Sequence, residues 1–337
     1  MSSNEARHWH RLPSGQIQCD LCPRFCTLQE GQSGLCFVRA RKDDRLWLTT
    51  YGRSSGFNVD PIEKKPLHHF YPGTTILSFG TAGCNLACRF CQNSDISKSR
   101  EMDVLSRSAS PRDIVEMAIS AQSPSIAFTY NDPVIFLEYA VDVAREAKAR
   151  GLHTVAVTAG YINPEPRVEF FEHMDAANID LKSFQEEFYQ KLTGAHLGAI
   201  LDTLKYVKHH TGVWLEITTL LIPEMNDSAE EIRQLCEWIA KELGPEVPLH
   251  FSAFHPSFKM LNVPSTPYQT LTRARNIAKE VGLHYVYLGN VHDPEGQSTF
   301  CQRCGTCLIT RDWYKVQVVA LKGGACAKCQ APLPGRF

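Results

Sequence analysis

The sequence predicts an α/β fold, because short apolar runs alternate with amphipathic helical patterns through the middle of the chain. Parallel strands need crossover connections, so this alternation favours a parallel sheet that curves into a full or partial barrel. Cysteine-rich stretches flank the alternating region and predict a separate module at each end. The strand-like runs are 76–79, 125–128, 154–157, 177–181, 213–221, 249–253 and 285–288.

The composition indicates a globular protein without a membrane segment. With 337 residues and 43% hydrophobic content, the chain can bury a substantial core. The formal net charge of -1 gives no electrostatic argument for binding to nucleic acid or to an anionic membrane. The sequence contains no apolar signal segment and no run of about 18 apolar residues. Thirteen cysteines in such a chain indicate metal sites in the reducing cytoplasm, where we expect the protein.

A loop that follows the first strand-like run carries Cys84, Cys88 and Cys91 with the spacing CxxxCxxC. Three thiolates on one loop can hold three irons of a 4Fe-4S cluster and leave the fourth iron without a protein ligand. A metal that keeps an open position can bind a small molecule there, whereas a site with four protein ligands is closed. The competing interpretation is a zinc knuckle that borrows a distant fourth cysteine.

Four cysteines near the N-terminus form a second set, which we call the front set. Gly31 and Gly34 let the chain fold back, so that the last of these cysteines can join the other three. Four thiolates suit zinc and an iron-sulfur cluster alike, so the sequence indicates a metal and leaves its identity open. The front set consists of Cys19, Cys22, Cys26 and Cys36.

Four cysteines near the C-terminus form a third set, the tail set. Their spacing CxxC…CxxC is typical of a zinc ribbon, in which two knuckles face each other across a hairpin. A ribbon of this size serves as a stabilising cap or grips a partner, and we favour the cap because short segments seldom fold without a staple. Cys307 is left as a free or accessory thiol, and Cys236 as a buried core thiol. The tail set consists of Cys301, Cys304, Cys326 and Cys329.

Polar residues follow several of the predicted strands. In barrels of parallel strands the reactive groups lie at the C-terminal ends of the strands. Asp180 and Lys182 are two residues apart, so strand alternation directs both charges to one face, where they can bind each other or a zwitterion. Tyr130, Asn131 and Asp132 are predicted at the mouth of the barrel. The predicted inward polar ring is Thr158, Asp180, Lys182, Glu216 and His255.

With these residues in view, the chain resembles the radical S-adenosylmethionine (SAM) superfamily. Within it the chain resembles the AmmeMemoRadiSam-system radical SAM enzymes, relatives of the activating enzymes of pyruvate formate-lyase. The motifs that carry the resemblance are CxLCPRxC, GCNLxCxFCQN, TYNDP, IDLKSF, LIPEMND, FHPSFKM and the terminal ribbon. The expected fold is therefore a partial (β/α)6-type TIM barrel as radical SAM core, between an N-terminal Cys-rich metal module and a C-terminal zinc-ribbon-like module.

The resemblance also assigns roles by position. Cys84, Cys88 and Cys91 are the expected cluster ligands, and Phe90 is expected beside the adenine of SAM. The SAM amino group is expected at Tyr130, Asn131 and Asp132, although Asp132 stands where the subfamily usually has Glu. Ala159 likewise stands where relatives have Asn. The remaining residues expected around SAM are Thr158, near its carboxylate, and Asp180, Lys182 and His255.

The function that the resemblance implies is reductive cleavage of SAM to a 5'-deoxyadenosyl radical, which abstracts hydrogen from a substrate. It implies a low-potential electron donor and an association with Memo-like and AMMECR-like proteins. The alternatives are an activase of a glycyl-radical enzyme and, from another class, a zinc-rich module that binds RNA or protein. The expected units are the N-terminal module and lead-in at 1–65, the core at 66–298 and the ribbon at 299–337.

Overall fold

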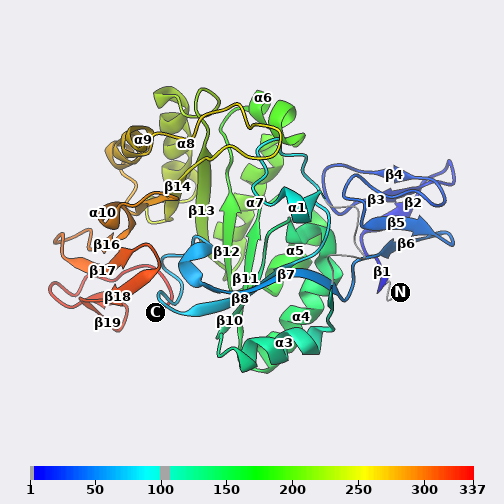
Figure 1. Cartoon of the computed structure of the whole chain (residues 1–337), viewed down its shortest axis with the longest axis horizontal. Helices are drawn as coiled ribbons and strands as arrows, with labels where there is room; N and C mark the ends of the chain where they lie inside the picture. The colour runs from blue at the N-terminus through cyan, green and yellow to red at the C-terminus, as the bar shows by residue number, and fades with distance from the viewer. Residues whose placement is uncertain (1–3, 99–106) are drawn as a thin grey trace.

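The computed structural model describes residues 4–98 and 107–337, and its centre is a parallel sheet. The strand order in this sheet is β15-β14-β13-β12-β11-β10-β8-β7-β9. All neighbours from β8 to β15 are parallel, whereas β7 runs antiparallel to both β8 and β9. Figure 1 shows the sheet in the middle, with the N-terminal strands on one side and the C-terminal strands on the other. The α/β class is therefore confirmed.

Each of the seven strand-like runs of the sequence becomes a parallel strand, with both ends within one residue of the prediction. One face of these strands carries apolar side chains of the main core, such as Ile179 and Ile217, whereas the other face also carries buried polar side chains, such as Asn178, Glu216 and His250. The described residues thus form seven parallel strands, one more than the six of the predicted (β/α)6-type barrel. They are β8 (Thr75–Gly80), β10 (Ser125–Phe128), β11 (His153–Thr158), β12 (Ala176–Asp180), β13 (Trp214–Leu221), β14 (Leu249–Ala253) and β15 (Val286–Gly289).

Long helices connect the parallel strands. Two of them begin at capping serines: Ser110 accepts a hydrogen bond from the N–H of Asp113, and Ser228 from that of Glu231. Cys236 is fully buried in α8, as predicted. The long helices are α3 (Pro111–Ser120), α4 (Leu137–Ala149), α5 (Pro164–Glu172), α7 (Leu197–His210), α8 (Ala229–Glu242) and α9 (Tyr268–Val281). The short ones are η1 (Ile62–Lys64), α1 (Ser94–Ser97), η2 (Pro133–Phe136), α6 (Glu186–Phe188), η3 (Tyr189–Thr193) and α10 (Pro294–Gln297). No helix of the described ranges is long and apolar enough to span a bilayer.

The N-terminal strands form two small sheets that pack against the core. A fully buried ion pair, Arg39 Nη2 to Glu138 Oε1 at 2.8 Å, joins this module to α4. The main sheet begins earlier than the expected boundary at residue 65, because β7 pairs with β8. The N-terminal strands are β1 (Asn4–Glu5), β2 (Trp9–Arg11), β3 (Ile17–Cys19), β4 (Thr27–Leu28), β5 (Arg39–Lys42) and β6 (Arg45–Leu48), followed by β7 (Arg53–Pro61) and later β9 (Arg107–Ser108).

The C-terminal strands form a separate small unit whose core includes residues of the main sheet. Tyr285 and Tyr287 pack with Leu308, Ile309 and Cys326 of the tail. These contacts fix the tail beside β15, the strand at one edge of the sheet. The strands are β16 (Thr299–Phe300), β17 (Cys307–Asp312), β18 (Lys315–Val318), β19 (Leu321–Lys322) and β20 (Ala325–Cys326).

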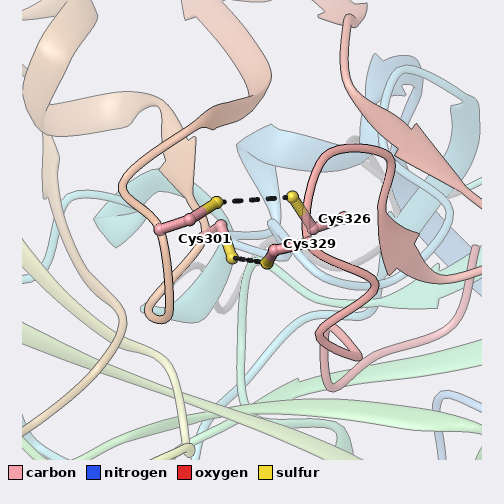
Figure 2. Close-up of side chains that lie close together, drawn as sticks. Cys301, Cys326 and Cys329 are labelled. Carbon is pink, nitrogen blue, oxygen red and sulfur yellow. Dashed lines mark hydrogen bonds between the residues drawn. The ribbon is translucent and has the colours of Figure 1, made fainter.

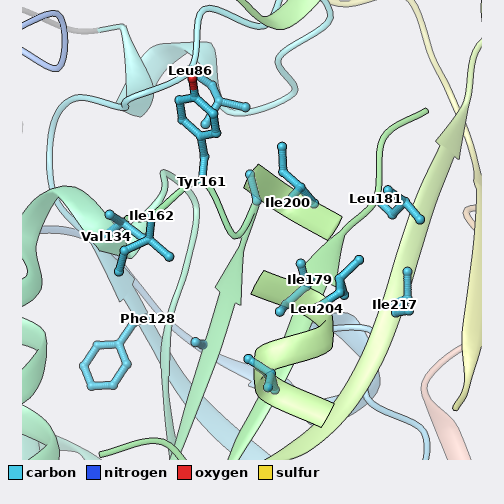
Figure 3. Packing of buried hydrophobic residues seen from close by; sticks show 14 of the residues in the cluster. Leu86, Phe128, Val134, Tyr161, Ile162, Ile179, Leu181, Ile200, Leu204 and Ile217 are labelled. Carbon is cyan, nitrogen blue, oxygen red and sulfur yellow. The ribbon is translucent and has the colours of Figure 1, made fainter. Parts of the chain in front are cut away.

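The main core lies between the sheet and the helices. Figure 3 shows Ile179 of β12 facing Ile200 and Leu204 of α7, and Leu86 of the cysteine loop and Tyr161 belong to the same buried cluster. All five side chains are buried, and burying one aliphatic side chain contributes about 1.5–3 kcal/mol. Packing of Leu86 therefore holds the cysteine loop on the core at the end of the strands.

Candidate active site

A cavity of about 290 Å³ lies at the C-terminal ends of the parallel strands. Its walls come from the cysteine loop and from the segments that end β10, β11 and β12, which are far apart in the sequence. The structure therefore brings together most of the residues that the sequence singled out. Those that line the cavity are Cys84, Cys88, Phe90, Cys91, Tyr130, Asn131, Asp132, Thr158, Asp180 and Lys182.

Asn131 holds the cysteine loop in place. Its Nδ2 donates to the carbonyl of Gly83 at 2.8 Å and to Thr81 Oγ1 at 3.2 Å. Gly83 has φ +92°, and a Cβ at this position would lie 2.4 Å from the carbonyl oxygen of Cys36. Only glycine fits a positive φ and so close an approach. The loop's shape thus depends on Asn131 inside the core and on the N-terminal module outside it.

The thiols of Cys84 and Cys88 lie in an environment that disfavours their charged form. Burial raises the pKa of Cys84, and it raises the pKa of Cys88 to about 12. A backbone N–H, that of Leu86, donates to Cys84 Sγ at 3.5 Å. Thiolates at such positions need the positive charge of a metal, since metal binding and deprotonation are coupled. A three-thiolate donor set of this kind fits iron or zinc and has no fourth cysteine among the residues that line the cavity.

Asp132 is buried beside the loop and is fully hydrogen-bonded. Thr158 Oγ1 donates to its Oδ1 at 2.8 Å, and the N–H of Ala159 donates to its Oδ2 at 3.1 Å. Burial raises the pKa of this carboxyl, although the hydrogen bonds from Thr158 and Val134 oppose the shift. Thr158 and Asp132 therefore act as one unit, which fixes the ends of β10 and β11 relative to each other.

Asp180 and Lys182 form an ion pair in the cavity wall, with Lys182 Nζ 2.7 Å from Asp180 Oδ2. Burial alone would lower the pKa of Lys182, but the charges of Asp180 and Cys88 outweigh it and raise the pKa. Both charges line the same cavity, in agreement with the alternation argument. The wall thus presents one charge of each sign beside the thiols.

Two aromatic residues complete the part of the site that the sequence predicted. Phe90 is buried and packs against Phe188, with ring centroids 5.7 Å apart. Tyr130 has φ +71°, and its hydroxyl lies 3.2 Å from Asp60 Oδ2. A positive φ is costly for a bulky residue, so the surrounding contacts must hold Tyr130 in this position.

Two residues of the predicted polar ring lie elsewhere. His255 is exposed, is not among the residues that line the cavity, and its Nδ1 lies 3.2 Å from Ser265 Oγ. Glu216 points inward but lies near the start of β13, outside the cavity. Its carboxylate accepts hydrogen bonds from the backbone N–H groups of His68 and His69, from Trp214 Nε1 and from His250 Nε2. The expectation of Glu216 at the mouth of the barrel is therefore wrong, because alternation fixes the face of a strand but not the depth along it.

The cavity wall also includes polar residues that the sequence analysis missed. In the part of the chain that the structure describes, Asn178 Oδ1 and Thr218 Oγ1 are buried without a hydrogen-bond partner, and both residues line the cavity. Buried polar atoms normally have partners, so these two atoms are suited to receive a polar ligand. The two-residue period of a strand could have identified Asn178, because it precedes Asp180 by two positions and so shares its face. Ser252 and Asn290 line the same cavity.

The tail set has the geometry of a single-ion site. Cys301 Sγ lies 3.5 Å from Cys329 Sγ, and Cys304 Sγ lies 3.7 Å from Cys326 Sγ (Figure 2). All four sulfur atoms lie within 4.8 Å of one another. Zinc-sulfur bonds of about 2.3 Å in a tetrahedron place the sulfur atoms about 3.8 Å apart, so the tail donor set fits zinc. Cys307 is not part of this group, and its thiol faces the carbonyl of Ile309.

Comparison with known proteins gives the class of this protein. The model of the radical SAM superfamily matches residues 79–239, which include the cysteine loop and the ends of β10 to β12. The chain belongs to this superfamily of enzymes, whose members use a 4Fe-4S cluster and SAM.

Particular relatives place the chain more closely. It is 40% identical over 317 residues to an uncharacterized protein of Methanocaldococcus jannaschii, covering 94% of each chain. It is 26% identical over 159 residues to the pyruvate formate-lyase-activating enzyme of Clostridium pasteurianum, covering 47% of this chain and 66% of that one. The pyruvate formate-lyase 1-activating enzyme of Escherichia coli is 21% identical over 227 residues, or 63% of this chain and 91% of that one. The chain is thus related to activating enzymes of pyruvate formate-lyase.

A solved structure shares the fold. The crystal structure of a radical SAM methyltransferase from Sphaerobacter thermophilus superposes with a TM-score of 0.52 at 14% identity. The match covers 85% of this chain and 76% of that one.

Proposed function

We propose that this protein cleaves SAM reductively and uses the resulting radical to remove hydrogen from a substrate in the central cavity. The observation that carries the proposal is the single cavity that three loop cysteines share with the Asp180–Lys182 pair. A site of three thiolates leaves a coordination position for a ligand, and a zwitterion such as the methionine end of SAM carries both charges that the pair complements.

In this proposal Cys84, Cys88 and Cys91 hold the 4Fe-4S cluster. When bound together, the cluster and SAM supply reductive cleavage of a sulfur-carbon bond, which gives methionine and a 5'-deoxyadenosyl radical. Phe90 packs against the adenine, as expected from its buried position in the cavity wall. The methionine end of SAM lies against the segment that ends β10 and against the Thr158 unit, with His255 left outside this set because it does not line the cavity.

The protein's own contribution is placement. Asn131 fixes the cysteine loop, and the Asp132–Thr158 unit fixes two strand ends, so the reacting groups meet in one geometry. Asn178 and Thr218 offer buried polar atoms to a ligand, and a ligand that fills the cavity displaces the water from it. Closing off water protects a reactive intermediate from side reactions.

The partners, the additional metals and the location of the protein are inferred from the motifs and the family resemblance. We place the enzyme in an AmmeMemoRadiSam system, with Memo-like and AMMECR-like proteins as functional partners and a low-potential electron donor. The tail set holds zinc and the front set holds a metal. The units remain an N-terminal metal module, a core with the partial-barrel architecture and a C-terminal ribbon, in a cytoplasmic protein.

A second candidate is an activase of a glycyl-radical enzyme. The similarity to pyruvate formate-lyase-activating enzymes of two bacteria favours it. In that case the substrate is a glycine of a partner enzyme. Incubation of the reduced protein and SAM with such a partner separates the two, because only an activase produces a glycyl radical signal in electron paramagnetic resonance (EPR).

The direct test is anaerobic reconstitution with iron and sulfide, followed by dithionite and SAM. The expected product is 5'-deoxyadenosine, quantified by chromatography. A protein that carries an intact cluster and forms no 5'-deoxyadenosine would overturn the proposal.

A further inference from the structure

The front set differs from the tail set in the spread of its sulfur atoms. Within the described residues, two groups have three or more ligand atoms mutually within 4.8 Å: the tail set, and His68 with Glu216 and His250. The front cysteines are absent from these groups, so no three of their sulfurs are as close as one tetrahedral ion requires. The three cysteines of the cysteine loop, Cys84, Cys88 and Cys91, are also absent from these groups. The sulfur atoms of the front set thus share the wide spacing of those in the cysteine loop. Members of the superfamily bind a 4Fe-4S cluster at that loop.

The four front cysteines nevertheless face one space. All of them line a single small cavity, together with Asn85 and Ile135 of the core. Cys19, Cys22 and Cys36 are buried, whereas Cys26 is partly exposed. Their common cavity and their wide separation fit a cluster of several irons better than one ion. With four cysteine ligands the site has no open iron, so its role is to carry electrons or to stabilise the fold.

The front set lies directly against the cysteine loop. Arg24 Nε donates to the carbonyl of Asn85 at 2.9 Å, and the carbonyl of Cys36 touches Gly83. Asn85 lines the front cavity, while its neighbour Cys84 lines the central cavity. Two consecutive residues of the cysteine loop thus line the two cavities.

From this geometry we infer that Cys19, Cys22, Cys26 and Cys36 hold a second 4Fe-4S cluster, through which electrons reach the cluster loop. The relay part rests on the proposed function, whereas the second cluster does not. One electron leaves a low-potential one-electron protein donor and enters at the solvent side, beside Cys26. It then passes by way of the Asn85 contact to the catalytic cluster and is used when the sulfur-carbon bond of SAM breaks.

The cluster is tested in the full-length triple variant Cys84→Ala, Cys88→Ala, Cys91→Ala, reconstituted anaerobically. We expect it to retain about four irons and four sulfides per chain, roughly half of the wild-type content. After reduction its EPR signal should not change when SAM is added, whereas the wild type should show one signal that changes and one that does not. A triple variant that contains no iron or sulfide and a second zinc ion in addition to that of the tail set would overturn the second cluster. This result does not depend on whether the wild type cleaves SAM.

The relay is tested with Cys26→Ser, against Cys307→Ser as a matched control outside all three sets. We expect Cys26→Ser to slow reduction of the catalytic cluster by reduced ferredoxin at least about tenfold, as followed by stopped-flow absorbance. Formation of 5'-deoxyadenosine with dithionite, which is small enough to enter the central cavity, should stay within about twofold of the control. Unchanged reduction by ferredoxin contradicts the relay. An equal loss with both reductants also contradicts it, because that loss indicates a structural role.

Discussion

The front and tail sets have identical ligands, four cysteines each, but their surroundings differ. The tail sulfurs lie within 4.8 Å of one another at the edge of the molecule, in a small unit of short strands. The front sulfurs are more widely spread, the carbonyl of Cys36 lies against Gly83 of the cysteine loop, and the side chain of Arg24 donates to the carbonyl of Asn85. The number of cysteines therefore does not decide which metal a site binds. The separation of the sulfurs indicates the type of site, and the neighbouring residues indicate its use.

The largest expected effect comes from the cysteine loop, which has three cysteines where the front and tail sets have four each. Replacement of Cys88 by Ala removes one of three ligands and should lower 5'-deoxyadenosine formation to background, a loss of more than about 10³-fold, about 4 kcal/mol. Iron should fall by about half, while zinc at the tail stays unchanged. Metal analysis and product chromatography measure both. Retention of activity in this variant would contradict the assignment of the loop.

The tail set should affect the free energy of unfolding but not the iron content of the protein. Replacement of Cys329 by Ser should release the zinc and lower the free energy of unfolding by more than about 4 kcal/mol, since loss of a structural metal is among the most destabilising changes. Denaturant unfolding with parallel zinc and iron analysis checks this. The control Cys307→Ser should stay within about 0.5 kcal/mol of the wild type. Loss of iron in Cys329→Ser would remove the distinction between the two sets.

A buried histidine connects the tail to the core and should make stability depend on pH. His69 Nδ1 donates to the carbonyl of Pro334 at 2.7 Å, so its Nε2 accepts from the hydroxyl of Tyr287 at 2.6 Å. Burial lowers the pKa of His69 from 6.5 to about 4. The unfolded chain therefore binds the proton first, and stability is lost as the pH falls from about 6.5 towards 4.

Replacement of His69 by Gln removes this titration. Between pH 7 and pH 5 the wild type should lose about 2 kcal/mol more than His69→Gln. Urea unfolding at both pH values measures the difference, and exposed His284→Gln should keep the wild-type dependence. Identical pH dependence in the wild type and His69→Gln would show that the ring is not held neutral at the junction.

The smallest expected effect concerns SAM positioning. In Asp132→Asn the hydrogen bonds from Thr158 and the backbone of Ala159 weaken, and we expect the KM for SAM to rise about tenfold, or about 1.4 kcal/mol. Asp132→Glu, which restores the charge, should recover most of the affinity. Steady-state kinetics of 5'-deoxyadenosine formation check this. Equal KM values for both variants and the wild type would exclude Asp132 from the SAM site.

The sequence predicted the scaffold of the site well, because local pattern determines it. Apolar runs defined the parallel strands to within one residue, and the two-residue period placed Asp180 and Lys182 on one face. The loop cysteines were evident from spacing alone.

Other features depend on tertiary structure. Glu216 has the same alternation as Thr218, yet it lies deeper along β13, where backbone N–H groups of a distant segment reach it. His255 is in a loop, where no strand period fixes its direction. Asn178 and Thr218 look like ordinary strand residues, and only the packed sheet shows that their polar atoms lack partners among the described residues. The wide spacing of the front sulfurs likewise depends on how the N-terminal strands fold against the core.

We propose that the iron left without a cysteine ligand at the cysteine loop binds SAM directly. Electron-nuclear double resonance on the reduced protein, with SAM labelled by ¹⁵N in its amino group and ¹⁷O in its carboxylate, tests this claim. The account predicts hyperfine coupling of both labels to the cluster, and its disappearance in Cys88→Ala. An intact cluster that shows no coupling to either label would contradict it.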